Sequence, residues 1–127
     1  MKYLHHKLLV ALFLPISIYA SDVYYCVEDR ITGFNPKENL AITKFKEGRF
    51  KVMIDFEQNM LQSSDLMFES YIKSTCLAYL DDLNCINDMG RSFIINKETL
   101  KFYRGVMYSP GKSNDSVYLS HGYCEKF

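Results

Sequence analysis

Four isolated cysteines, spread over most of the chain, restrict the fold of this 127-residue protein more than any other feature. In a small domain that matures in an oxidising compartment, an even number of cysteines indicates disulfides, and four allow three pairings. We predict that Cys26 pairs with Cys124, which would fasten the first strand to the last, and that Cys76 pairs with Cys85. The second bond would close a short loop around the acidic turn Asp81-Asp82.

The N-terminus points to such a compartment. Residues 1–20 begin with a basic segment, continue with the uncharged run 8–14 and end in Ala20, a pattern typical of a cleaved signal peptide. The alternative is an amphipathic or buried N-terminal helix. The apolar stretch 8–18 is about half of the ~20 residues that a membrane span needs, and bulky Tyr25 before Cys26 argues against a lipid anchor. We therefore expect a soluble product, periplasmic or secreted, without stable membrane insertion.

The remaining residues, 21–127, have an ordinary length for one domain with its own core. Without Lys2 and Lys7 of the leader, 13 basic residues stand against 15 acidic ones, and no run of like charge is present. A nucleic-acid-binding protein usually carries a basic patch that neutralises phosphates, so we do not expect this class.

Period-two alternation predicts strands. Over 49–57, the apolar side chains of Phe50, Val52, Ile54 and Phe56 share one face. The turn signal Glu47-Gly48 precedes this strand, and residues 41–46 are predicted to be its hairpin partner. Further strands are expected over 23–28 at a sheet edge, over 91–96 and 100–109 as a hairpin, and over 116–124 after a polar turn at 112–115.

The segment 58–80 fits either a helix or two short strands, because its apolar residues satisfy both spacings. Short runs at 60–63 and 67–73, with recurring β-branched and aromatic residues, favour strands. The 16 Tyr and Phe residues after the leader also suit a sheet, where rings pack across strands. We therefore predict a mainly β fold, a small antiparallel barrel or sandwich of about seven to nine strands. The bond between Cys26 and Cys124 should favour its closure.

Candidate chemical sites are few. The cysteines lack zinc-ligand spacing and His121 is the one histidine after the leader, so we expect neither a metal nor a cofactor. Ser120 and His121 would face opposite sides of a strand, which argues against a local catalytic pair. Glu28-Asp29-Arg30 is interpreted as a charged strand end, and Gly122 within a strand indicates a bulge or a close backbone approach.

Arg104 shares a predicted strand face with Leu100, Phe102 and Val106. An arginine on an apolar face either pairs with a buried acid or is displayed at a binding site. Tyr103 and Lys101, on the opposite face, would form an exposed aromatic and cationic patch. The predicted binding surface therefore comprises Lys101, Tyr103, Arg104 and His121.

The chain ending resembles that of short uncharacterised exported proteins of marine bacteria. The shared pattern runs over 100–104 and 115–127, with Tyr25-Cys26 and Thr32-Gly33-Phe34 near the start, and it implies no activity. The layout is also similar to that of small β-barrel lysozyme inhibitors of the periplasm. Those proteins carry a Ser-Gly-containing loop and a tryptophan-bearing segment, whereas this chain has no Trp, which argues against inhibition.

These features predict an exported, non-enzymatic binding module for an envelope protein or a small ligand. A structural or stress-protective envelope component without a discrete ligand is the alternative. A small hydrolase would require Ser120, His121 and carboxylates to converge in space.

Overall fold

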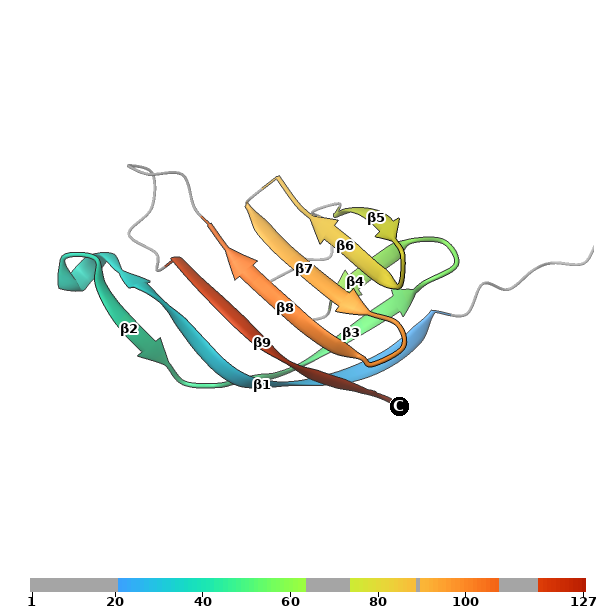
Figure 1. Cartoon of the computed structure of the whole chain (residues 1–127), viewed down its shortest axis with the longest axis horizontal. Coiled ribbons are helices and arrows are strands. Elements are labelled where there is room, and N and C mark those ends of the chain that lie inside the picture. The colour runs from blue at the N-terminus through green and yellow to red at the C-terminus, as the bar shows by residue number, and fades with distance from the viewer. Residues whose placement is uncertain (1–20, 64–73, 89, 108–116) are drawn as a thin grey trace, which may run out of the picture.

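The computed structural model describes residues 21–63, 74–88, 90–107 and 117–127 (Figure 1). The predicted signal peptide over 1–20, the strand expected over 67–73 and the polar turn at 112–115 lie outside them. The described residues form one short 3-10 helix, Pro36–Glu38, and nine strands. The strands are β1 (Asp22–Asn35), β2 (Ala41–Phe45), β3 (Arg49–Asp55), β4 (Met60–Ser63), β5 (Thr75–Tyr79), β6 (Asp82–Ile86), β7 (Arg91–Asn96), β8 (Lys101–Val106) and β9 (Val117–Lys126).

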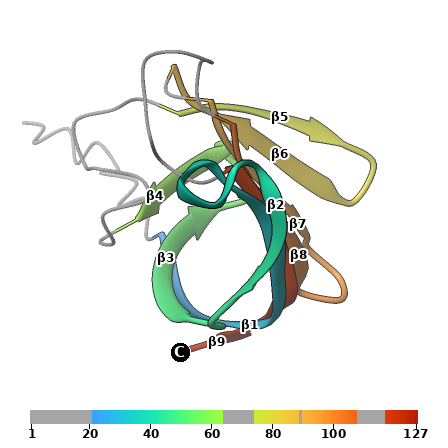
Figure 2. The same ribbon diagram turned by 90° about the vertical axis from the view of Figure 1, so that its left-hand side faces the viewer.

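All strand pairs are antiparallel, and the sheet order is β4-β3-β1-β9-β8-β7-β6-β5, with β2 pairing with β1 as well. The sheet curls until its two end strands, β4 and β5, approach each other, which gives a nearly closed barrel (Figure 2). The predicted mainly β fold is confirmed in its barrel form. The described parts of 58–80 are strand and turn, not helix. Across the described residues, no helix is long and apolar enough to cross a bilayer.

The core lies inside the barrel and is centred on three phenylalanines. The Phe93 and Phe102 rings stack with centroids 5.3 Å apart, and the Phe50 ring meets both edge-on. The alternation predicted for the strand at 49–57 is confirmed as far as Asp55, because Phe50, Val52 and Ile54 are all buried, whereas Phe56 lies in the turn that follows β3. Burial of each such side chain stabilises the fold by about 1.5–3 kcal/mol.

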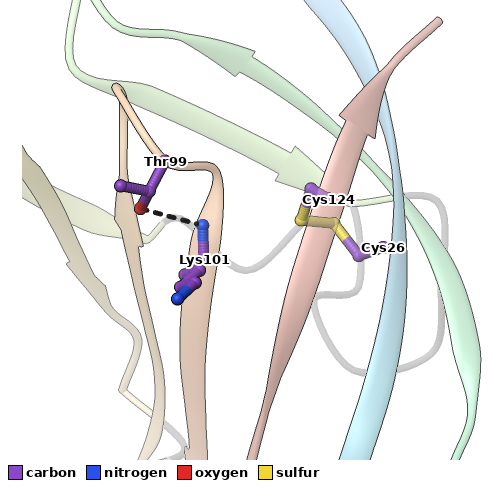
Figure 3. The surroundings of a disulfide bond; sticks show 4 residues. All are labelled: Cys26, Thr99, Lys101 and Cys124. Atoms are coloured by element: carbon purple, nitrogen blue, oxygen red, sulfur yellow. Dashed lines mark hydrogen bonds between the residues drawn. A yellow bond between two sulfur atoms is a disulfide. The ribbon is translucent and has the colours of Figure 1, made fainter.

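Both predicted disulfides are present. Cys26–Cys124 joins β1 to β9 beside the turn between β7 and β8, where the Lys101 N–H donates to Thr99 Oγ1 (Figure 3). Cys76–Cys85 links directly opposed residues of β5 and β6. The first bond fastens the first strand to the last, as predicted, but its expected role in closing the barrel was wrong. β1 and β9 are neighbours in the middle of the sheet order, whereas the barrel closes between β4 and β5.

The first strand differs most from the prediction. It has fourteen residues, continues well past residue 28 and lies between β3 and β9 rather than at an edge. The charged residues that indicated its end coincide with a register shift between Glu28 and Arg30, which is a β-bulge. A bulge absorbs an extra residue without ending the strand.

The predicted hairpin of 41–46 with 49–57 is also wrong. β2 pairs with residues 31–35 of β1, and β3 pairs with residues 22–27 of the same strand. The two strands therefore follow each other along one edge of β1. Gly48 marks the crossing, because its C=O accepts from the Glu28 N–H at 3.0 Å and its N–H donates to Glu28 Oε2 at 2.8 Å. The hairpin predicted over 91–96 and 100–109 is confirmed as β7 and β8.

Candidate functional site

The four residues of the predicted binding surface do not share one side of the sheet. Lys101, Tyr103 and His121 lie on the outside of the barrel, and Tyr103 stands directly opposite His121 with ring centroids 6.5 Å apart. Arg104 lies inside and is 8% exposed. The strand period dictates this division, since neighbouring residues of β8 point to opposite faces.

An outer aromatic face covers β1, β9 and β8. It comprises Tyr25, Tyr103, Leu119, His121, Tyr123 and Phe127, all of them exposed. Tyr103 and Leu119 are 67% and 68% exposed, and the Tyr25 and Phe127 rings meet edge-on at 5.3 Å. Sequence reasoning identified Tyr103 and His121 in this face. It missed Leu119 and Tyr123, which share the face of His121 through the period of β9, as well as Phe127, and it missed Tyr25, which the pairing of β1 with β9 brings to this face.

Basic side chains flank the outer aromatic face. Lys51 on β3 places its ammonium 4.9 Å from the centre of the Tyr25 ring. Arg49 stands opposite Val27, and Arg30 stands opposite His121. On β1, β3, β8 and β9, the exposed charged residues that point to this side are Arg30, Arg49, Lys51 and Lys101, against Asp29 and Glu125. The excess of cations contrasts with the slightly acidic composition of residues 21–127.

Inside the barrel, Glu28 and Arg104 form a buried ion pair. Glu28 Oε1 accepts from Arg104 Nη2 at 2.8 Å and from Ser120 Oγ at 2.7 Å, while Oε2 accepts from the Gly48 N–H. The guanidinium carbon of Arg104 lies 4.7 Å from the centre of the Phe50 ring. This arrangement matches one of the two alternatives for Arg104, pairing with a buried acid.

The bulge in β1 explains how an acid reaches the core. Asp29 is the extra residue of the bulge, so Glu28 before it points inward, Arg30 after it points outward and Ile31 points inward again. Opposite the bulge stands Gly122, where an added Cβ would lie 1.9 Å from the Val27 carbonyl oxygen. The prediction of a bulge or close approach at Gly122 is confirmed. The interpretation of Glu28 as part of a solvated strand end was wrong.

The residues that a hydrolase would need do not converge. Ser120 points into the barrel and donates to Glu28, whereas His121 lies outside, 3.9 Å from Asp29. Asp81 lies in the β5–β6 turn and pairs with Lys97 at 3.2 Å. Among the described residues, no group of three or more His, Cys, Asp or Glu gathers as a metal site.

A small hollow lies between the β3–β4 turn and the β5–β6 hairpin. It measures about 50 Å³ and is lined by Phe56, Asn59, Ala78, Leu80, Asp81, Asp82, Leu83 and Lys97. Sites for small organic ligands usually measure ~300–1,000 Å³. The hollow therefore has room for a few water molecules or one side chain.

Comparisons with models of protein families, with curated protein sequences and with solved structures each found no match.

Proposed function

We propose that this chain is an exported, non-enzymatic binding module that recognises a protein partner through its outer aromatic face. The exposure of Tyr103 and Leu119 on adjacent strands is the observation that carries the proposal. Tyrosine is enriched at protein interfaces, since it brings a large apolar surface and a polar hydroxyl with few rotatable bonds. Contiguous apolar side chains on an exposed sheet face are typical of a contact surface.

Charge supports a partner with an acidic surface. Arg30, Arg49, Lys51 and Lys101 surround the aromatic side chains. Complementary charge speeds diffusional encounter and sets the orientation of two proteins, and salt screens it. The proposed interaction should therefore form more slowly as the salt concentration rises.

Export to the periplasm or beyond is the second part of the proposal. The leader pattern at 1–20 supports it, and two disulfides are consistent with an oxidising compartment. The internal ion pair has a structural role in this proposal, because Glu28 and Arg104 satisfy each other inside the barrel.

A capture experiment tests the proposal. The wild-type protein and a Tyr103→Ser/Leu119→Ser variant are immobilised and exposed to envelope extract, and bound proteins are quantified by mass spectrometry. Ile42→Ser is the matched control, because Ile42 is 77% exposed but lies on β2. One acidic protein should bind the wild type and the control, and the double variant should lose it.

The captured protein is then purified, and its association rate with the wild type is measured at rising salt. Equal capture by all three proteins, or none by any, would contradict the proposal. The second result is the one expected of a structural or stress-protective envelope component without a discrete ligand.

A further inference from the structure

β5 lies at one end of the sheet and leaves one backbone edge unpaired within the described part of the chain. Its hydrogen-bonded neighbour there is β6. The Cα atoms of Cys76 and Cys85 are 4.0 Å apart, a distance typical of the close pairs that exchange no backbone hydrogen bonds. The N–H and C=O of Cys76 therefore point away from β6. By the strand period, those of Ala78 point the same way.

Both faces of β5 are exposed. Leu77 and Tyr79, on the outer face, are 70% and 71% exposed. Ala78 stands opposite buried Leu83 and so faces the barrel interior, yet it is also exposed and lines the small hollow. β4, at the other end of the sheet, approaches β5, but among the described residues no hydrogen-bonded ladder joins the two strands.

Within the strand itself, β5 has none of the charges, prolines or bulges that block pairing at natural sheet edges. β5 has the sequence Thr-Cys-Leu-Ala-Tyr, without charge or proline, and its register with β6 is regular along its whole length. Charged residues, prolines and bulges are the usual means of blocking an edge. The disulfide to β6 holds β5 in place, so little conformational freedom is lost when a further strand joins.

We propose that this edge pairs antiparallel with β5 of a second copy of the chain, about a twofold axis at Leu77. Leu77 then faces Leu77 of the second copy, Cys76 faces its Ala78, and Thr75 faces its Tyr79. In this register the outward-pointing N–H and C=O groups of Cys76 form hydrogen bonds with those of Ala78 in the second copy. Like charges opposed across two strands are destabilising, and β5 has no charged side chain to oppose its own copy.

Pairing of the two β5 strands would also make the outer surfaces of the two sheets continuous. A row of directly paired residues crosses the outside of the barrel and ends at the proposed axis, in the order Arg30, His121, Tyr103, Ile94, Asn84 and Leu77. In the dimer this row continues into its copy. Two outer aromatic faces would then belong to one continuous sheet, which makes the assembly bivalent.

The size of the contact sets its strength. Two five-residue strands bury less than the ~800 Å² per partner of a standard interface. We therefore expect a dimer that dissociates on dilution and forms at high local concentration. The dimer does not depend on the proposed function, because it concerns self-association and not the outer partner; only its bivalence rests on that proposal.

Analytical ultracentrifugation of the full chain with both disulfides formed tests the proposal, from about 1 μM to about 1 mM, the range of weak interfaces. Wild-type protein should shift from monomer to dimer. Ala78→Pro removes an edge N–H and leaves the ladder to β6 intact, and Leu77→Lys places two ammonium groups opposite each other. Each should raise the dimer dissociation constant at least about tenfold, which corresponds to about 1.4 kcal/mol.

Ile86→Lys is the control, since Ile86 is an exposed residue of β6 one strand away from the edge. It should dimerise like the wild type. Circular dichroism confirms that each variant is folded. A wild type that stays monomeric throughout would overturn the proposal. So would a dimer that both edge variants preserve, since its interface would then lie elsewhere.

Discussion

Glu28 Oε1 and Arg104 Nη2 lie 2.8 Å apart inside the barrel, where the Glu28 side chain is 2% exposed and the Arg104 side chain is 9% exposed. A charge taken out of water costs several kcal/mol unless a partner and hydrogen bonds compensate it. Glu28 has three such donors, from Arg104, Ser120 and Gly48. These donors come from β8, β9 and the crossing between β2 and β3, so one carboxylate connects three distant parts of the chain.

Removal of one partner of this pair should be strongly destabilising. Arg104→Met leaves the Glu28 carboxylate buried without its cation, and we expect a loss of about 3–5 kcal/mol in the free energy of unfolding. Urea denaturation followed by circular dichroism measures it. Glu28→Gln/Arg104→Met, which removes both charges, should recover at least half of the loss.

Lys97→Met is the matched control, because it breaks the exposed pair with Asp81, where both side chains are about half in solvent. Exposed pairs contribute about 0–1 kcal/mol. An equal loss for Lys97→Met and Arg104→Met would contradict the importance assigned to burial.

Gly122→Ala should disturb the bulge in β1. The added Cβ would lie 1.9 Å from the Val27 carbonyl oxygen, a backbone atom that moves only with the whole strand. Overpacking of this kind costs about 1–3 kcal/mol and occasionally more. In Gly48→Ala the nearest atom is Glu28 Oε2 at 3.1 Å, so a smaller loss is expected. The midpoints of thermal unfolding measure the stability lost in the two variants. A Gly122→Ala variant as stable as the wild type would contradict the close packing at the bulge.

The two disulfides should differ in their contribution to stability. They close loops with sequence separations of 98 and 9 residues. The chain-entropy model gives about 4.7 kcal/mol for the long loop and about 2.6 kcal/mol for the short one. Cys26→Ala/Cys124→Ala should therefore lower the urea midpoint more than Cys76→Ala/Cys85→Ala. The reverse order would show that the cross-link acts mainly through the folded state.

Stability should fall at alkaline pH. Burial raises the pKa of Tyr24 above 10.0, with Asp22 as a further cause, and a hydrogen bond to Asp22 raises the pKa of Lys126 above 10.5. The folded state then binds more protons than the unfolded state in this range, so the free energy of unfolding decreases as the pH rises above about 10. Urea titrations at a series of pH values measure the slope. Tyr24→Phe should make the dependence of the free energy of unfolding on pH less steep. Tyr79→Phe is the control variant, because Tyr79 is 71% exposed.

Local patterns in the sequence predicted the features that depend on near neighbours. The alternation from Phe50 to Ile54 predicted a strand, and the short spacing of Cys76 and Cys85 predicted a disulfide around a turn, because both features depend on adjacent segments. The strand period alone predicted that Tyr103 and Arg104 point to opposite faces of the sheet.

Features that depend on remote partners were not predictable in this way. β2 has the composition of a hairpin partner for β3, and only its pairing with residues 31–35 of β1 excludes that role. Glu28 looks like a solvated charge until β8 and β9 bring Arg104 and Ser120 to it. Gly122 and an arginine on an apolar face were the available signals, but neither identifies its partner.

The position of β1 has a consequence for the order of assembly. One edge of β1 is filled by β9 (Val117–Lys126), so the pairing of β1 is complete only after β9 has joined it. Topologies ruled by such remote pairing fold slowly, in about milliseconds to seconds. If the chain is exported as proposed, β1 would stay unpaired on this edge until β9 had also crossed the membrane.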